Sequence, residues 1–191
     1  ALAGPEPAAT VTAKAAVAAE LVQAASESSP AADAVPLTIR EALNGVLRER
    51  LAHDERVVVY GQDIADPKGD VFGVTRGLSA EFPQRVFNAP LTESTIVGTG
   101  IGRALAGQRP VVMIQFADFL PLAYNQLVSE LAMLHWRADG QWPTPLIVLA
   151  PCGGYRPGLG PYHAQTMDGT FAHVPGLDVF MPSTAADAAG L

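Results

Sequence analysis

The chain has 191 residues, a formal net charge of −7 and 49% hydrophobic residues, which is enough for one substantial core but not for two complete domains. Only two lysines occur, Lys14 and Lys68, and this acidic balance argues against a nucleic-acid partner. No run of about eighteen apolar residues is free of charges and helix breakers, so we expect no membrane-spanning segment.

The cysteine content and the N-terminus bear on location. The single cysteine, Cys152, excludes an intrachain disulfide and indicates a reducing compartment. No basic start, apolar run and cleavage site follow one another as in a secretory signal. We therefore expect a cytoplasmic protein, or one of the mitochondrial matrix in a eukaryote. The chain begins at Ala1 rather than Met, so we interpret it as a piece of a longer protein.

Residues 1–36 differ in composition from the rest. Fourteen of them are alanine and none is aromatic. Alanine is the best helix former, so Ala13 to Ala25 are suited to a helix, but its outer face offers little to bury. We predict an Ala/Pro-rich linker that is partly helical, or a segment that packs on a neighbour. Residues 37–191 are predicted to form one globular domain.

Helices and short apolar strands alternate through residues 37–191. The capping box Thr38–Glu41 predicts a helix that ends near His53, and further helices are expected at about 77–82, 93–107, 121–136 and from 184 onward. His163 is expected to open a helical turn toward His173. Strands are predicted at 57–60, 86–89, 111–116, 146–150 and 178–181. The pattern predicts an α/β fold with a doubly wound, mostly parallel sheet flanked by helices.

Residues 86–102 form a predicted strand, a polar turn and a glycine-containing helix. Thr92 is the expected N-cap, and Glu93 falls in the first helical turn. Gly98 and Gly102 each lower helix propensity by about 1 kcal/mol, which predicts close backbone packing at these positions. On position alone, Glu93 either complements the helix macrodipole or serves a site.

Polar or aromatic residues follow four of the predicted strands. They are Gln62 with Asp63, Glu93, Phe119 and His163. In open α/β sheets, ligands bind at the edge formed by the carboxyl ends of the strands. We therefore predict one crevice there, with Glu93 and His163 as candidates for proton transfer.

Other patterns support no separate site. The glycine-rich loop 152–161 lacks the ending of a P-loop and the spacing of a dinucleotide motif, which favours a plain connection over a phosphate cradle. His163 and His173 lie ten apart with Cys152 nearby, which is not a zinc-ligand spacing. We interpret His135 as a partner of a helix C-terminus. No Gly-x-Ser-x-Gly elbow occurs, so serine hydrolysis is not supported.

A family resemblance follows from longer motifs. From Leu37 to Leu191 the chain resembles the beta subunit of the thiamine-diphosphate-dependent 2-oxo acid dehydrogenases of the pyruvate and branched-chain types. The resemblance implies the thiamine diphosphate-binding fold and its pyrimidine-binding, transketolase-like domain. The motifs that carry it are Val59–Asp63, Pro90–Ser94, Ala106–Val112, Ile114–Phe119, Tyr162–Gln165 and Phe171–Leu177.

The resemblance also implies roles for single residues. Glu93 matches the glutamate that hydrogen-bonds a pyrimidine ring nitrogen and so helps the cofactor lose a proton from its thiazolium carbon. Phe119 matches the aromatic residue that packs on the pyrimidine, and Gln62 lies at the same cofactor site. His163 matches the histidine that helps to pass the acyl group to lipoyl-lysine on the acyltransferase partner. The implied substrate is a 2-oxo acid, with the branched-chain type favoured over pyruvate.

Two features depart from the family pattern. Gln62 stands where the family often has a second acidic residue, and because glutamine cannot titrate, proton coupling between paired sites is in doubt. Ala164 replaces the family's serine, which removes one hydroxyl.

A larger part of the family's site has no counterpart in the chain. The family holds the diphosphate and Mg²⁺ with a Gly-Asp-Gly motif and an Asn on the alpha subunit, and no such motif occurs here. We expect an alpha-like subunit, or an alpha-like part of one fused polypeptide, to supply that site. This chain alone is then an inactive half-site without a metal, within a homo- or hetero-oligomer.

Two alternatives stay open. One is another thiamine enzyme of the transketolase or deoxyxylulose-phosphate synthase type, against which the motifs Tyr162–Gln165 and Phe171–Leu177 weigh. The other is a non-catalytic assembly module that keeps the fold. A neighbouring gene for an acyltransferase with a lipoyl domain would favour the dehydrogenase.

Overall fold

A single parallel sheet lies at the centre of the computed structural model, which describes residues 36–191. Its strands have the order β2-β1-β3-β4 and are β1 (Val57–Gly61), β2 (Val86–Asn88), β3 (Arg109–Met113) and β4 (Ile147–Leu149). The predicted α/β class with a parallel sheet is confirmed. The linker predicted for residues 1–36 lies, up to residue 35, outside the described residues.

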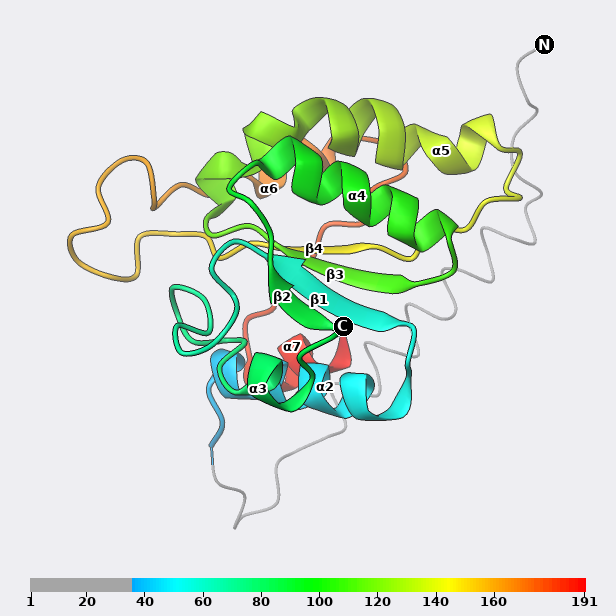
Figure 1. Ribbon diagram of the computed structural model, residues 1–191. Coiled ribbons are helices and arrows are strands. Elements are labelled where there is room, and N and C mark those ends of the chain that lie inside the picture. Colours follow the sequence, from blue (N-terminus) through cyan, green and yellow to red (C-terminus); the bar gives the residue numbers. More distant parts are fainter. Residues whose placement is uncertain (1–35) are drawn as a thin grey trace.

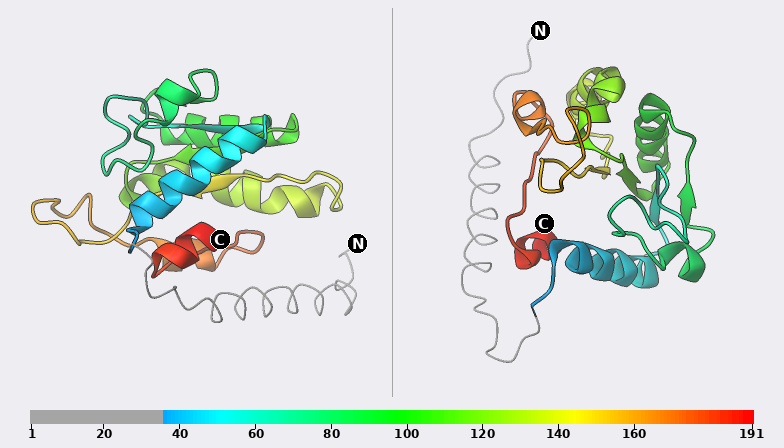
Figure 2. Two further views of the ribbon diagram at one scale, coloured as in Figure 1. Left: turned by 90° about the horizontal axis from the view of Figure 1, so that it is seen from below. Right: turned by 90° about the vertical axis from the view of Figure 1, so that its left-hand side faces the viewer.

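Helices cover both faces of the sheet (Figure 1). One face carries α2 (Ile39–His53), α3 (Leu78–Glu81) and α7 (Ala185–Gly190). The other carries α4 (Glu93–Leu105), the 3₁₀ helix η1 (Ala117–Ala123), the π-helix η2 (Gln126–Leu131), α5 (Ala132–Arg137) and α6 (Asp168–Ala172). The right-hand view in Figure 2 shows the sheet between these two layers.

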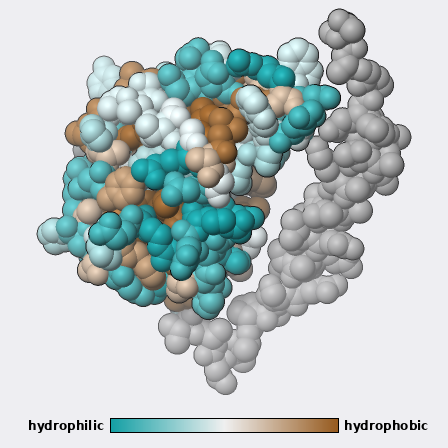
Figure 3. Space-filling view, turned by 45° about the vertical axis from the view of Figure 1, so that its right-hand side comes forward, coloured by the Kyte–Doolittle hydropathy of each residue, from teal (hydrophilic) through white to brown (hydrophobic). Residues whose placement is uncertain are grey.

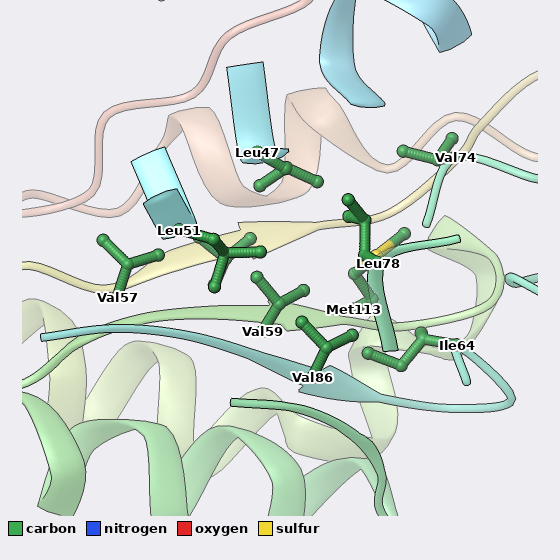
Figure 4. Close-up of a cluster of buried hydrophobic side chains, with 10 residues drawn as sticks. Leu47, Leu51, Val57, Val59, Ile64, Val74, Leu78, Val86 and Met113 are labelled. Carbon is green, nitrogen blue, oxygen red and sulfur yellow. The ribbon is translucent and has the colours of Figure 1, made fainter. Parts of the chain in front are cut away.

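Strand β1 has two buried faces, which explains its uninterrupted apolar sequence. Val57 and Val59 join the cluster that lies between the sheet and helices α2 and α3 (Figure 4). Val58 and Tyr60 join a second cluster on the α4 side. Full burial of each valine side chain is worth about 1.5–3 kcal/mol, so β1 anchors both halves of the core.

Helix α2 begins with the predicted capping box. The Glu41 N–H donates to Thr38 Oγ1 over 3.2 Å, and the Thr38 N–H donates to Glu41 Oε2 over 2.9 Å. These bonds satisfy two amides that a helix N-terminus leaves without partners, and the bonds from Thr38 lower the pKa of Glu41. Helix α7, which packs against α2, repeats the arrangement with Thr184 and Asp187.

The close packing predicted at Gly98 and Gly102 is wrong. A Cβ at Gly102 would meet nothing within 4 Å, and one at Gly98 would meet a single side-chain atom at 3.7 Å. The tight glycine is Gly100, where a Cβ would lie 3.0 Å from Leu146 Cδ1 and 3.2 Å from Val112 Cγ1. Residues four apart share a helix face while the residue midway lies opposite, so α4 turns Gly100 toward the sheet.

The helical segment after β3 is not the uniform helix that the apolar periodicity predicts. It starts early, as the 3₁₀ helix η1 at Ala117, passes through η2 and becomes regular only in α5. Pro121 lies inside η1 and has no amide hydrogen to donate, which disfavours a continuous α-helix there. The preceding strand also ends at Met113 rather than at Phe116.

Two predictions near the C-terminus are wrong. Residues 178–181 form no strand in the described chain, and Val179, Phe180 and Met181 are 39%, 61% and 50% exposed. An apolar run becomes a strand only where a neighbouring strand offers hydrogen-bond partners, and the segment runs extended from α6 to α7 without pairing (Figure 2). His163 does not open a helix, because α6 begins at Asp168.

Large hydrophobic side chains remain exposed on the described surface. Leu105, Trp136, Trp142 and Ile147 are 45–66% exposed. Figure 3 shows one face of the molecule, on which hydrophobic atoms reach the surface between hydrophilic ones. Within residues 36–191, no helix combines the length and the apolar character that a membrane crossing requires.

Candidate functional site

All four residues predicted for the site lie at the carboxyl edge of the sheet. Gln62 directly follows β1, and Glu93 is the first residue of α4 after β2. Phe119 lies in η1 after β3, and His163 lies in the loop after β4. Parallel strands bring these separate segments to one edge, as the sequence predicts.

Gln62 connects Glu93 to the end of β3. Its Nε2 donates to Glu93 Oε1 over 2.8 Å, and its Oε1 accepts the Gln115 N–H over 2.9 Å. A backbone N–H can only donate, so the amide oxygen of Gln62 must face Gln115 and its NH₂ must face Glu93. Among the described residues, the second oxygen of Glu93, Oε2, has no hydrogen-bond partner. One carboxylate oxygen is thus held and the other is free for a ligand.

The first turn of α4 turns Glu93 toward β1 rather than toward its own helix. Thr92 occupies the predicted N-cap position, but its hydroxyl donates to Thr95 Oγ1 over 3.0 Å and caps no amide. The Glu93 carboxylate is half-buried and bonds Gln62. The macrodipole favours a carboxylate at this position, but it does not explain a directed bond to the residue that follows β1.

An aromatic cluster holds Phe119 and His163. The Phe119 ring lies edge-on to Phe116 and to His163, with centroids 6.0 and 5.5 Å apart. Phe116 also contacts His163 at 4.7 Å and Phe72 at 5.7 Å. Each such pair contributes about 0.5–1.5 kcal/mol beyond burial, so the cluster fixes the orientation of the two rings.

The loop that carries His163 is tied at both ends. The Gln165 N–H lies 3.3 Å from both oxygens of Asp118, and the Gly153 N–H donates to the Gln165 carbonyl over 3.3 Å. His163 Nδ1 lies 3.1 Å from the Leu159 carbonyl oxygen. A carbonyl oxygen can only accept, so Nδ1 carries the hydrogen and Nε2 of the neutral ring carries the lone pair. His163 therefore presents a proton acceptor.

Carboxylates stabilise the loop that follows Gln62. Asp63 has a φ of 57° and accepts a hydrogen bond from Gln115 Nε2 over 2.6 Å, and it also pairs with Lys68. Asp66 accepts the Gly77 N–H over 2.7 Å, which is the main reason why the pKa of Asp66 lies below its ordinary value. These bonds anchor the loop from which Gln62 emerges.

The sequence pattern missed three residues of this arrangement. Gln115 and Phe116 lay inside the predicted strand 111–116, whereas the strand ends at Met113 and both residues are at the edge. Gln115 is the one polar residue of that apolar run, which is a usable signal. Phe72 lies in the loop after β1, and no pattern indicates its contact with Phe116.

The arrangement fits the pyrimidine end of thiamine diphosphate. A carboxylate with one free oxygen suits a ring nitrogen, and the half-buried ring of Phe119 offers an apolar face or edge to a planar heterocycle. Within residues 36–191, no group of three or more His, Cys, Asp or Glu side chains is arranged to hold a metal ion.

Comparison with known proteins supports this assignment. The profile of the family "Transketolase, pyrimidine binding domain" matches residues 35–191. The 2-oxoisovalerate dehydrogenase subunit beta of Bacillus subtilis (strain 168) is 45% identical over 152 residues, which are 79% of this chain and 46% of that protein. The pyruvate dehydrogenase E1 component subunit beta of Leifsonia xyli subsp. xyli is 39% identical over 170 residues, 88% of this chain and 49% of that protein. The chain spans about half the length of the curated relatives it matches.

A solved structure described as "Split gene transketolase, inactive beta4 tetramer" has a TM-score of 0.60 to this chain. It is 21% identical and covers 81% of this chain and 46% of its own, so the likeness shows the fold alone. The family match and the dehydrogenase relatives confirm the resemblance that the sequence motifs indicate. The chain belongs to the transketolase pyrimidine-binding domain family, and its sequence is that of a beta-subunit-like member similar to thiamine-diphosphate-dependent 2-oxo acid dehydrogenases.

Proposed function

We propose that this chain is the pyrimidine-binding half of a thiamine diphosphate site in a 2-oxo acid dehydrogenase. The whole protein decarboxylates a 2-oxo acid and passes the acyl group to lipoyl-lysine. The observation that carries the proposal is Glu93, held through one oxygen by Gln62 and free at the other, on the edge that also bears Phe119. The names of the similar beta subunits support the substrate class, with a branched-chain acid as the first choice.

Each residue has a role that its contacts allow. Glu93 Oε2 shares a proton with the pyrimidine ring nitrogen, and Gln62 holds the carboxylate in place. Phe119 packs on the ring, in an orientation that Phe116 maintains. His163 Nε2 accepts or returns a proton during acyl transfer to the lipoyl group. Bound thiamine diphosphate supplies the electron sink for loss of carbon dioxide.

A second wall of the site comes from an alpha-like subunit or domain that holds the diphosphate and Mg²⁺. Exposed apolar side chains near the site support such a partner. Leu91, Leu122 and Tyr162 are 68%, 64% and 71% exposed, and they belong to the segments that carry Glu93, Phe119 and His163. Exposed apolar surface of this kind is typical of an interface. The chain alone is then inactive, and the assembled protein works in the cytoplasm or the mitochondrial matrix.

Substrate turnover tests the proposal against its alternatives. The complete protein is given thiamine diphosphate, Mg²⁺ and a panel of branched-chain 2-oxo acids and pyruvate, and released carbon dioxide is measured. We expect decarboxylation, with the branched-chain acids preferred. Transfer of a two-carbon unit between sugar phosphates instead would indicate a transketolase-type enzyme. Cofactor binding without any turnover would indicate an assembly module.

Calorimetry tests the half-site claim separately. The 191-residue chain is titrated with thiamine diphosphate and Mg²⁺, and we expect no tight binding because the diphosphate contacts lie on the partner. Micromolar affinity of the chain alone would contradict the half-site. For experiments on the complete protein in which Glu93 is replaced by Gln, Glu130→Gln is the matched control. Glu130 pairs with Arg137 on the surface of the helical segment.

A further inference from the structure

We propose that Gln62 is a positioning residue that ties Glu93 Oε1 with a permanent hydrogen-bond donor and leaves Oε2 as the only oxygen that shares a proton with the ligand. The inference deepens the proposed function and rests on it, since it concerns the same carboxylate. In this role Gln62 holds the carboxylate of Glu93 in place. The sequence alone indicates only that residue 62 cannot titrate.

The direction of the hydrogen bonds is fixed by the backbone just after β3. The Gln115 N–H donates to Gln62 Oε1, and Gln62 Nε2 donates to Glu93 Oε1. A flipped amide would place NH₂ against the Gln115 N–H and an oxygen against the carboxylate, so both bonds would be lost. Gln62 is 3% exposed, so water cannot readily replace either partner.

Further contacts hold Gln62 and Gln115 in place. The Gln62 N–H donates to the Met113 carbonyl over 3.0 Å, which continues the pairing of β1 with β3. At Gly61 a Cβ would lie 2.1 Å from the Met113 oxygen, so only glycine permits this approach. The side chain of Gln115 is anchored by its bond to Asp63. Gln62 therefore starts from a fixed backbone and reaches Glu93 in a fixed direction.

No other titratable group takes part in these bonds among the described residues. Asp70 lines a small pocket together with Gln62 and Gln115, but its carboxylate accepts the N–H groups of Gly73 and Val74. Asp63 bonds Gln115 and Lys68 and reaches neither Gln62 nor Glu93. Within residues 36–191, the donor to Glu93 Oε1 is thus Gln62 alone.

An amide differs from a carboxyl group in this position. A glutamate here would accept the Gln115 N–H as Gln62 does, but it would donate to Glu93 only while the pair of carboxyls holds a proton. Gln62 donates in every protonation state and carries no proton onward. Glu93 therefore exchanges its proton through Oε2 alone, and not through residue 62.

Nuclear magnetic resonance of the 191-residue chain tests the bond without the cofactor. The ¹⁵N-labelled side-chain amide of Gln62 is followed, with exposed Gln141 as the control. We expect slow hydrogen exchange at Gln62 and a clear shift of its signal in Glu93→Ala, with no change at Gln141. Fast exchange and an unchanged signal at Gln62 in Glu93→Ala would overturn the proposal.

The variant Gln62→Glu separates positioning from folding. Its carboxyl keeps the acceptor for Gln115, so the fold is retained, but the donor to Glu93 depends on a shared proton. We expect the ¹³C carboxyl signals of residues 62 and 93 in this variant to change together with pH, because the two carboxyls share a proton. Independent titration of the two carboxyls would overturn the proposal. If the variant does not fold, the amide signals of the unchanged chain still decide the question.

The complete protein supplies the functional readout. Loss of a hydrogen bond to a charged group weakens binding by roughly tenfold to a hundredfold. We therefore expect Gln62→Glu to raise the KM for thiamine diphosphate by this factor. The increase should be smaller at low pH, where the pair of carboxyls holds a proton. The same substitution at Gln141 should change nothing. If the protein decarboxylates no 2-oxo acid, the proposed function fails while the resonance experiments still judge the role of Gln62.

Discussion

Two glycines of α4 should respond to alanine in opposite ways. Gly102→Ala places a methyl group in open space and gains helix propensity, so the free energy of unfolding should rise by about 1 kcal/mol. Gly100→Ala gains the same propensity, but the new Cβ meets Leu146 Cδ1 at 3.0 Å and Val112 Cγ1 at 3.2 Å.

The size of the difference follows from packing. Val112 is fully buried and β-branched, so it can yield little, and overpacking of a dense core costs about 1–3 kcal/mol. The propensity gain cancels between the two variants. Gly100→Ala should therefore be less stable than Gly102→Ala by about 1–3 kcal/mol.

Urea unfolding of both variants measures this difference. We expect the midpoints to move apart while the slope m stays the same, which assigns the change to the native packing. Equal midpoints for Gly100→Ala and Gly102→Ala would refute the argument, because they would mean that α4 does not rest on the sheet through Gly100.

Three further predictions concern other parts of the domain. Thr38→Ala removes the capping box of α2 and should lower the free energy of unfolding by about 1 kcal/mol in the same assay, and an unchanged value would contradict the cap. The hydrogen bonds from Arg56 lower the pKa of Asp54 from 3.8 to about 2, so the stability contributed by this carboxylate is present above pH 3.8 and lost as the pH falls through 2. Asp54→Asn should therefore make the free energy of unfolding depend less on pH below 3.8. An identical slope in the variant and the unchanged protein would count against the ion pair. Burial, with help from nearby carboxylates that include Asp168, raises the pKa of the Cys152 thiol. Iodoacetamide should thus alkylate Cys152 at neutral pH more slowly in the native chain than in urea, whereas equal rates would contradict this environment.

The strands of the core were predictable because their burial leaves a direct mark on the sequence. Val57–Tyr60 is apolar throughout, since its side chains enter clusters on both faces of the sheet. The same strands also predicted the carboxyl edge of the sheet. That edge carries Gln62, Glu93, Phe119 and His163. Chain order and strand polarity are enough for a prediction of this kind.

Other features depend on three-dimensional partners and left no such mark. Residues 178–181 have an apolar pattern, but a strand also requires a neighbour with free backbone groups. The tight glycine of α4 depends on how the helix is rotated against Leu146 and Val112. The bond from Gln62 to Glu93 depends on where β3 ends, because that end places the Gln115 N–H.

We propose that Glu93 shares a proton with the pyrimidine ring of the cofactor. The most direct test is the rate at which the thiazolium C2 hydrogen of thiamine diphosphate exchanges for deuterium in the complete protein with Mg²⁺, measured by acid quench and proton resonance. General acid–base catalysis contributes about 10²–10⁴-fold, so Glu93→Gln should slow the exchange by at least about a hundredfold while Glu130→Gln leaves it unchanged. An exchange rate in Glu93→Gln equal to that of the unchanged protein would contradict the account.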